Sequence, residues 1–526
     1  MTQATEVIVV GAGPTGLTLA LQAHDHGARV RIVEQRSQAF RPSRALILHP
    51  RTLEVLRPLG VTDALLAQAA RSAEFHLHLG SRVIRVRLPE FALPDTAFPH
   101  FSLVRQMDVE DVLIQALEER GVAVEWGTEL VEVVDEAMRA RITLRSLAGS
   151  EQTHCDVLAG CDGPESTVRR AAGIGWHGGP YREEVVLADV ELATDVAAGV
   201  SHIVVGRHGL LFVFALGERA TWRLLATRPS GADVLPFGQP GPPVLDGELQ
   251  ALLDDAGLDA RVTYSAWSAR YRLQHRLASR FRQGRLFLAG DAAHATSPAG
   301  GQGMNAGIQD AANLGWKLAF AAASSDRASL LDSYDLERRP VARQLLALTR
   351  LLFWAEASIG PLPRLVRGVL APLSAPAVPF LLERRRLVAE AIRLLSQLRV
   401  SYPTSPLSEE GDLRSRGGPH TGQRLPDATV TVDGRQMRLH ALLAQPGIHV
   451  LLGRDATSVE QQRFGPLVTV HRLTSMPGTG LVAIRPDGYI GFRSRSVDHA
   501  QLDAWLARIG AGTPAAAPIP QSPADG

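Results

Sequence analysis

Three glycines near the N-terminus have the spacing of a phosphate-binding turn. Gly11, Gly13 and Gly16 follow a short apolar run and precede a helical pattern. In such a turn the first glycine permits the tight bend, the second lets the backbone approach a pyrophosphate, and the third lets the helix pack closely on the strand. Glu34 lies about twenty residues further on, where a carboxylate accepts hydrogen bonds from a ribose and repels a 2′-phosphate. The pattern predicts a site for FAD or NAD, and not for NADP.

A second motif places an acidic turn after another apolar run, residues 154–160. Asp162 and Gly163 lead into a helix that begins near Ser166 and Thr167. An aspartate at the carboxyl end of a strand lies where α/β sheets bind their ligands, although the same residue can simply cap a turn. We favour ligand binding here and keep the turn cap as the alternative.

A third motif joins a strand that ends in Gly290-Asp291 to a glycine-rich helix start. The glycines within residues 300–303 leave several backbone N–H groups uncovered, which is typical of a cradle for negative charge. Asp291, beside them, can bind a hydroxyl-rich chain. His294 could be a base, but a histidine one turn past such a loop is more often packed and hydrogen-bonded, and we favour this structural role.

The apolar spacing indicates which elements position these motifs. Each motif follows a strand and precedes a helix, which predicts a Rossmann-like α/β domain. Residues 184–191, 202–214 and 221–228 instead read as consecutive strands with short turns, which predicts an inserted antiparallel sheet. Most of its apolar side chains are expected to be plain core. Those that could wall a pocket for a flat apolar ligand include Phe212, Phe214 and Trp222.

Several arginines follow the first motif. For Arg44 we favour contact with an anion, whereas Arg51 is better explained as ordinary surface charge. His49, between them, is predicted to be structural.

Composition limits the functional class. The 526 residues exceed what one hydrophobic core usually supports, so two or three domains are expected. The 55 Lys and Arg nearly balance the 54 Asp and Glu without a basic block, which argues against a nucleic-acid partner. Cys155 and Cys161 form no Cys-x-x-Cys pair, so neither a disulfide framework nor a metal site is predicted.

The sequence also predicts a cytoplasmic protein without a membrane partner. We find no basic segment followed by a long apolar one at the N-terminus, as a signal peptide would require. The apolar stretch 368–382 is interrupted by three prolines and is too short to cross a bilayer.

In their order and spacing, the three motifs resemble those of the class A flavoprotein monooxygenases of the para-hydroxybenzoate hydroxylase type, over about residues 5–400. The resemblance implies that Asp291 holds the FAD ribityl chain and Glu34 the adenosine ribose. It also implies that Asp162-Gly163 serves both FAD and the nicotinamide nucleotide.

The same resemblance implies flavin contacts from Arg44, from Arg105-Gln106 and from the loop around residues 298–305. Together, the motifs and the resemblance predict cofactor contacts at Gly11, Gly13, Pro14, Thr15, Gly16, Glu34, Gln35, Arg36, Arg44, Arg105, Gln106, Asp162, Gly163, Arg169, Gly290, Asp291, Pro298, Gly301, Gln302, Gly303, Met304 and Asn305. Pro298 is also predicted to face the substrate.

The resemblance further implies an enzyme in which NADPH or NADH reduces FAD, O2 forms a flavin C4a-hydroperoxide, and one oxygen atom passes to an electron-rich aromatic substrate. No second nucleotide fingerprint is visible, which fits a transiently bound reductant. The chain resembles members that act on bulky polycyclic or antibiotic-like phenols. The alternatives are Baeyer-Villiger oxygenation, a flavin reductase or oxidase, and a non-catalytic FAD-binding protein. No catalytic base is identified.

We therefore predict a discontinuous FAD-binding domain with a helical extension, residues 1–175 and 270–400. An inserted mixed or antiparallel sheet, residues 176–269 with about 75–100, is predicted to bind the substrate. A linker, 401–422, leads to an α/β domain, 423–510, that resembles thioredoxin but has no cysteine and so no disulfide chemistry. Residues 511–526 are predicted to be a disordered tail. The chain is expected to be a monomer or a homodimer.

Overall fold

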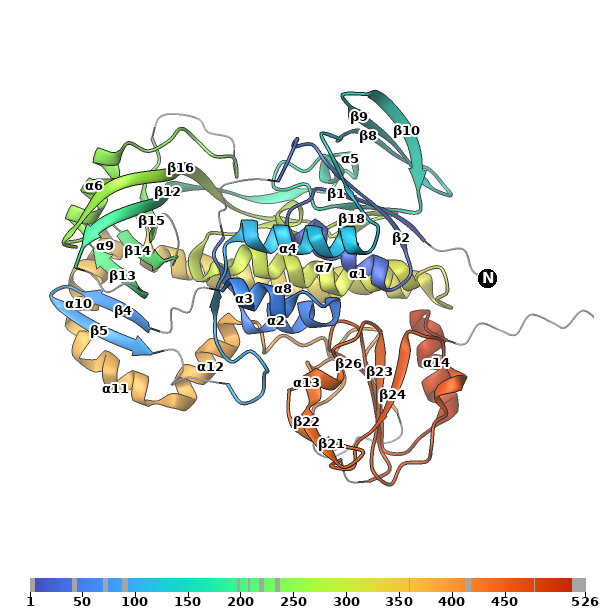
Figure 1. Ribbon diagram of the computed structural model, residues 1–526. Helices are drawn as coiled ribbons and strands as arrows, with labels where there is room; N and C mark the ends of the chain where they lie inside the picture. The colour runs from blue at the N-terminus through green and yellow to red at the C-terminus, as the bar shows by residue number, and fades with distance from the viewer. Residues whose placement is uncertain are drawn as a thin grey trace, which may run out of the picture.

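The computed structural model describes residues 5–39, 45–69, 74–87, 93–195, 199–206, 209–216, 222–231, 237–358, 360–411, 418–476 and 478–512. It is a mixed α/β fold in which two large sheets lie on either side of a central helical layer, with a smaller C-terminal sheet domain below them in Figure 1.

The first sheet has the strand order β17-β18-β11-β1-β2-β7. Its strands are β1 Glu6–Val10, β2 Arg29–Glu34, β7 Val124–Trp126, β11 Val157–Gly160, β17 Arg282–Gln283 and β18 Leu286–Leu288. All neighbours are parallel except the short edge strand β17. Buried aliphatic residues fill β1 and β11, as expected where helices cover a parallel sheet.

The helices that cover this sheet follow the predicted pattern. They are α1 Pro14–Asp25, α4 Gln106–Glu119 and α7 Gln302–Phe320. Smaller elements complete the region: β3 Ile47–Leu48, α2 Pro50–Leu56, η1 Arg57–Leu59, α3 Thr62–Gln68, β6 Ser102–Leu103, β8 Glu129–Asp135, β9 Ala140–Ser146, β10 Gly149–Cys155 and α5 Thr167–Ala171. The predicted strand, turn and helix order is therefore confirmed for the first motif.

The second sheet has eight strands in the order β19-β16-β12-β15-β14-β13-β4-β5. They are β4 Glu74–Leu79, β5 Arg82–Arg87, β12 Trp176–Thr194, β13 Val200–Gly206, β14 Gly209–Ala215, β15 Trp222–Pro229, β16 Ala260–Ala278 and β19 His294–Ala295. The antiparallel pairing predicted for the middle strands is present, whereas β13 and β4 are parallel. The helix α6, Asp246–Asp255, covers one face.

A helical layer continues from the long helix α8, Arg327–Glu356. It comprises α9 Pro361–Leu365, η5 Val366–Leu370, α10 Ala371–Ser374, η6 Ala375–Ala377, α11 Val378–Glu383 and α12 Arg385–Leu395. Ala375 packs against Leu79 and Ile84, so this layer covers the edge strands β4 and β5 (Figure 1).

The C-terminal domain has a five-stranded sheet in the order β20-β26-β25-β23-β24. Its elements are β20 Glu409–Glu410, β21 Thr429–Val432, β22 Arg435–Arg438, α13 Leu439–Leu442, β23 Ile448–Leu452, η7 Gln461–Arg463, β24 Val468–Arg472, β25 Leu481–Ile484, β26 Ile490–Ser494 and α14 His499–Ile509. Its core is continuous with Trp316, Phe320 and Leu330 of α7 and α8. The domain therefore shares a core with the rest of the chain.

Buried ion pairs bind the C-terminal domain to α7 and α8. Glu337 of α8 binds Lys317 of α7 and Arg485 of the C-terminal domain, each at 2.7 Å between nitrogen and oxygen. Although burial alone would raise the pKa of the Glu337 carboxyl, Arg485 and Lys317 hold it well below its usual value. Removing one partner of such a buried pair typically costs about 3–5 kcal/mol, because the other charge is left uncompensated.

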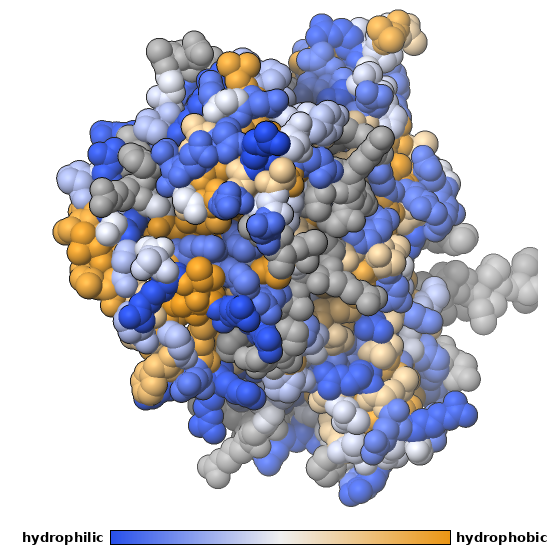
Figure 2. Space-filling model, turned by 60° about the vertical axis from the view of Figure 1, so that its left-hand side comes forward, coloured by the Kyte–Doolittle hydropathy of each residue, from blue (hydrophilic) through white to orange (hydrophobic). Residues whose placement is uncertain are grey.

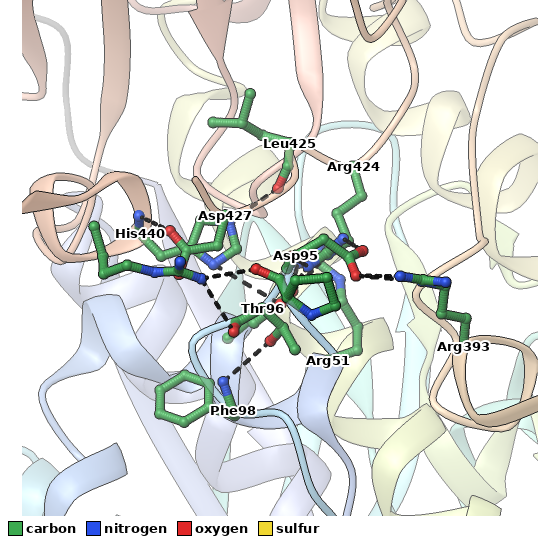
Figure 3. Close-up of polar contacts among 12 residues, drawn as sticks. Arg51, Asp95, Thr96, Phe98, Arg393, Arg424, Leu425, Asp427 and His440 are labelled. Carbon is green, nitrogen blue, oxygen red and sulfur yellow. Dashed lines mark hydrogen bonds and ion pairs between the residues drawn. The ribbon is translucent and has the colours of Figure 1, made fainter. Parts of the chain in front are cut away.

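A second network joins the same domain to α2 and to the segment before β6 (Figure 3). Arg424 binds both oxygens of Glu54 at 2.8 and 2.6 Å. Asp95 accepts hydrogen bonds from Arg424 at 3.4 Å and from Arg393 of α12 at 2.7 Å. Burial opposes ionisation of Glu54, but Arg424 outweighs it and lowers the pKa of Glu54 to about 2. The carboxylate therefore stays charged at neutral pH.

Buried histidines make the fold sensitive to mild acid. Burial lowers the pKa of His26 and of His49 from 6.5 to about 4. In the unfolded chain these histidines bind a proton near pH 6.5, whereas in the folded chain they stay neutral until about pH 4. Their contribution to the free energy of unfolding is therefore complete above pH 6.5 and is lost as the pH falls towards 4.

We expect the free energy of unfolding to fall by on the order of 1–3 kcal/mol per buried histidine between pH 6.5 and 4. Thermal unfolding measured at about pH 7.5 and about pH 5 tests this. His26→Asn should narrow the difference in Tm between the two conditions. His154→Asn is the control, because His154 is exposed on β10 and should leave the difference unchanged. A wild-type Tm that does not change with pH would contradict the prediction.

Candidate functional site

The three sequence motifs meet at one edge of the first sheet. Gly11 follows β1, Glu34 ends β2, Asp162 follows β11, and Gly290 follows β18. These four strands are parallel neighbours, so their carboxyl ends point the same way. Such an edge, outside the carboxyl ends of parallel strands, is where open α/β sheets bind ligands. The structure thus brings together residues that are far apart in the sequence.

The glycine turn is shaped by close backbone contacts and leaves one side open. Gly11 has φ +102°, and a Cβ there would collide with the Cys161 carbonyl. A Cβ on Gly16 would strike the Gly11 carbonyl oxygen. At Gly13, by contrast, a Cβ would meet no atom within 4 Å, and Gly13 is the N-cap residue of α1, without a side-chain cap. Open space beside uncapped N–H groups fits a pyrophosphate.

The neighbours of the turn are packed differently. Pro14 begins α1. Thr15 lies close to Gly290, because a Cβ built on Gly290 would be 2.6 Å from the Thr15 hydroxyl oxygen. Thr15 therefore fixes the start of α1 against the third motif. Gln35 is exposed.

Glu34 is a buried carboxylate that braces the turn. It accepts hydrogen bonds from the Ala12 N–H at 2.8 Å and from the Arg36 backbone N–H and Nε, both at 3.0 Å. Burial alone would raise the pKa of Glu34, but the hydrogen bonds from Arg36 and Ala12 outweigh it and lower the pKa. Arg36 Nη2 donates a fourth hydrogen bond to Glu34, at 3.2 Å. These four bonds use the lone pairs of the carboxylate, so a ribose hydroxyl would bind Glu34 in place of one of its contacts with Arg36.

Asp162 combines the two roles that the sequence left open. One oxygen, Oδ2, accepts hydrogen bonds from the N–H groups of Thr167 and Val168 at 2.7 and 3.2 Å, and so caps α5. The other, Oδ1, is buried and has no hydrogen-bond partner within the described ranges. Burial raises the pKa of Asp162. Gly163, with φ +76°, completes the turn.

Arg169 ties the second motif to the third. Its guanidinium donates to the carbonyl of Ala292 at 3.0 Å and to that of Pro164 at 2.6 Å, and lies 4.1 Å above the Trp176 ring. The side chain is thus held by protein groups.

Asp291 lies half-buried in the short helix η3, Gly290–Ala292. Its carboxylate makes no hydrogen bond or ion pair within the part of the chain that the structure describes, unlike the carboxylate of the neighbouring Asp310. Asp310 accepts from Gly290 N–H at 3.1 Å, His294 Nε2 at 2.6 Å and Arg338 Nε at 2.7 Å. The predicted structural role of His294 is therefore confirmed, and Asp291 is the carboxylate left for a ligand.

The glycine-rich loop has an uncapped helix start and internally bonded side chains. Gly300 and Gly301 have φ of +70° and +63°, and α7 begins at Gly301 without a side-chain cap. Asn305 accepts from the His49 N–H at 2.9 Å and the Thr52 hydroxyl at 2.7 Å. His49 is buried, as its predicted structural role requires.

Gln302, also in this loop, donates to the Leu395 carbonyl at 2.8 Å and accepts from Gln397 at 3.0 Å. The side chains of Gln302 and Asn305 therefore hold the loop, and mainly its backbone can face a cofactor. Met304 packs against the main core, and Gly303 lies near Thr296. Arg51, predicted to be surface charge, is instead buried against Glu54 and the Asp487 carbonyl.

Arg105 and Gln106, two of the positions predicted beside the flavin, lie next to Ala45. Gln106 accepts from the Ala45 N–H at 3.3 Å and donates to Glu110 at 2.8 Å. Arg105 binds Asp108 at 3.0 Å. These contacts hold the segment that follows Arg44, which itself lies outside the described residues.

The predicted pocket-wall residues separate onto two faces of the eight-stranded sheet. Phe212 and Phe214 stack at 5.6 Å between ring centroids and pack with Leu46 of the first domain. Trp222 instead lies in the core beneath α6. The register pairs Phe214 with Arg223 and so turns Trp222 to the opposite face, where it is part of the core. Pro298 is half-buried, next to Ala299 in the Phe353 cluster.

Comparisons with known proteins identify the family. Residues 4–349 match the model of the FAD binding domain, and residues 418–514 match that of the aromatic-ring hydroxylase C-terminal domain. The chain is 32% identical to a 6-methylpretetramide 4-monooxygenase from Streptomyces rimosus, over 98% of this chain and 97% of that protein. It is 31% identical to a rifampicin monooxygenase from Streptomyces venezuelae, over 96% and 100% of the two chains.

A solved structure of an anhydrotetracycline hydroxylase from Streptomyces rimosus superimposes with a TM-score of 0.74, at 27% identity over 97% of this chain and 100% of that one. The match extends across both large sheets and the C-terminal domain. The chain therefore belongs to the FAD-binding aromatic-ring hydroxylases, a family of flavin-dependent monooxygenases.

Proposed function

We propose that this protein hydroxylates a bulky polycyclic phenol with one atom of O2, at the expense of NADPH or NADH. The observation that carries the proposal is Asp291, a half-buried carboxylate that makes no hydrogen bond or ion pair among the described residues, beside the uncapped start of α7 at the sheet edge. Relatives named for pretetramide and rifampicin support the polycyclic substrate class.

The residues at this edge fit FAD. We assign the pyrophosphate to the open side of Gly13, the adenosine ribose to Glu34 and the ribityl hydroxyls to Asp291. The free oxygen of Asp162 and the backbone of residues 301–305 complete the cofactor site. Bound FAD supplies hydride acceptance from NAD(P)H and oxygen transfer from O2 to an electron-rich ring. Per turnover, the aromatic C–H becomes C–OH, NAD(P)H is oxidised, and the second oxygen atom leaves as water.

The chain contributes binding and orientation. Phe212 and Phe214 give the second sheet a flat apolar surface beside Leu46 and Leu103. We propose that aromatic rings of the substrate stack there, with Pro298 closing the flavin side. On the same sheet face, Arg223 is bound at 2.7 Å to both oxygens of Asp189, so this pair offers no free charge to the substrate. An apolar surface of this kind favours orientation by shape and exclusion of water.

We also propose that the C-terminal domain is thioredoxin-like and has a structural role. A central strand, β23, that is parallel to β24 and antiparallel to β25 supports this assignment. No cysteine follows Cys161 in the sequence, so the domain cannot carry out dithiol chemistry. The domain boundaries given above, a cytoplasmic location and a monomer or homodimer stay proposals of the same kind.

Gly13→Ala tests the pyrophosphate assignment. Because the new methyl group meets nothing within 4 Å, the apo-protein should keep its Tm. The same methyl group would occupy the space assigned to FAD, so its Kd should rise about tenfold or more, equivalent to about 1.4 kcal/mol. Fluorescence titration of apo-protein with FAD measures this. Gly247→Ala in α6 is the control and should bind FAD normally. Unchanged FAD affinity in Gly13→Ala would refute the assignment.

Asp291→Ala tests the ribityl assignment. The carboxylate has no partner among the residues that the structure describes, so its removal should leave the apo Tm nearly unchanged. We expect FAD binding to weaken by roughly 1–3 kcal/mol, the usual cost of a lost hydrogen bond to a charged group. Asp332→Ala, an exposed carboxylate of α8, is the control. A purified variant that retains a full complement of FAD would contradict the role.

The reaction itself is tested by anaerobic stopped-flow reduction of FAD with NADPH. The sequence has a single nucleotide-binding motif, so we expect the reduction of FAD by NADPH to depend on the aromatic substrate. Bound substrate would shift the population towards the conformation in which FAD is reduced. Polycyclic phenols should accelerate reduction more than single-ring phenols, and product mass should rise by one oxygen atom. Equal rates with and without substrate would favour a reductase or oxidase. Insertion of oxygen next to a carbonyl would favour Baeyer-Villiger chemistry.

A further inference from the structure

The helices after α8 expose an unusually apolar surface. The run Pro361–Glu383 has 23 residues, and its most apolar stretch has a mean hydropathy of 1.6 with only 11% of it buried. The exposed large apolar side chains of this run and its neighbours, here termed the apolar surface, are Leu351, Trp354, Leu362, Leu365, Val369, Leu370, Leu373, Phe380, Leu381, Leu387 and Leu394. Contiguous exposed apolar surface on a water-soluble fold usually marks an interaction site.

The apolar surface is gathered on one side of the molecule. The helices α9, α10 and α11 lie on the left-hand side of Figure 1. Figure 2 is turned so that this side comes forward, and it shows orange side chains concentrated on the left half of the face in view. Leu373 is the most exposed member, at 71%. The opposite side of the run, around Ala375 and Val378, packs on β4 and β5. The run is therefore fixed along the protein surface.

Positive charge borders the apolar surface. Residues 361–386 contain five arginines and one acidic residue, Glu383. Arg367 is buried and donates to the carbonyls of Ala355 and Ser358, but the other four arginines are exposed. Arg384 lies 5.0 Å above the ring of Phe380. Leu, Phe and Trp beside exposed arginines are typical of helices that lie in a membrane interface.

We propose that the apolar surface docks reversibly on an anionic lipid surface. The apolar side chains would enter the boundary between headgroups and acyl chains, and Arg364, Arg385 and Arg386 would contact phosphate groups. Each basic residue near an anionic membrane contributes about 1 kcal/mol. Five prolines and the packing on β4 and β5 keep the run from crossing the bilayer. The proposal departs from the sequence-based expectation of no membrane partner.

Charge favours lipid over a second copy of the chain. A twofold interface uses the same patch on both subunits. Pairing this surface with itself would bring two arginine groups together, with Glu383 as the lone acidic residue of the run to offset them. Anionic headgroups neutralise the same arginines without that repulsion. The proposal does not depend on which substrate the enzyme oxidises.

Vesicle flotation with the full-length FAD-loaded enzyme tests the proposal. The vesicles are phosphatidylcholine alone, or phosphatidylcholine mixed with phosphatidylglycerol. We expect the wild type to float with the anionic vesicles, to bind the neutral ones several-fold less, and to be released at about 0.5 M salt, where screening shortens the range of surface charge. Leu373→Glu should reduce the bound fraction several-fold. Arg385→Glu should remove most of the preference for anionic vesicles.

Leu147→Glu is the matched control, because Leu147 is a fully exposed leucine on the β9–β10 turn and should leave flotation unchanged. The flavin spectrum and Tm of each variant establish that it is folded. Absence of wild-type flotation, or equal binding to both vesicle types, would overturn the proposal. Light scattering measures the oligomeric state and covers the remaining outcome. If the wild type does not bind vesicles and is a dimer that Leu373→Glu converts to a monomer, the apolar surface joins two copies of the chain.

Discussion

The parallel pairing of β1 with β2 on one side and β11 on the other is the constraint on which the site depends. With β18 beside β11, this register places four carboxyl ends side by side, so a single edge receives Gly11, Glu34, Asp162 and Gly290. None of these residues would be useful alone. A shift of any strand would separate the open glycine turn from the carboxylates that complete it. The buried apolar residues of β1 and β11 therefore determine the cofactor chemistry indirectly.

Charge is used differently at the site and at the domain contact. At the sheet edge, Asp291 and one oxygen of Asp162 lack protein partners within the described residues, which suits them to a polar ligand. Between the domains, Glu54 and Glu337 are fully paired with arginine or lysine. The domain contact is also connected to the glycine-rich loop before α7. Glu54 belongs to α2, and at the start of the same helix His49 and Thr52 donate hydrogen bonds to Asn305 of α7. The C-terminal domain can thus support the cofactor without touching it.

Local patterns predicted the motifs well, because each depends on a few consecutive residues. The glycine turn, the acidic ends of the strands and the structural role of His294 all follow from short-range spacing and the limits it places on the backbone. Long-range partners could not be predicted in this way. Nothing near Gln302 in the sequence indicates that its side chain binds Leu395 and Gln397, and nothing near Arg51 indicates its burial beneath the C-terminal domain. The face of the sheet on which Trp222 lies could not be predicted either. Alternation along a strand shows which residues share a face within that strand, but not how neighbouring strands are aligned.

The shared core has a consequence for synthesis of the chain. Trp316, Phe320 and Leu330 belong to the FAD-binding part, yet their packing partners, such as Ile448 and Trp505, are among the last residues to leave the ribosome. At about 5–20 residues per second, the interval is on the order of ten seconds or more. During that time these side chains lack their cover and can bind chaperones or other nascent chains. The order of translation therefore makes completion of the FAD-binding part wait for the C-terminal domain.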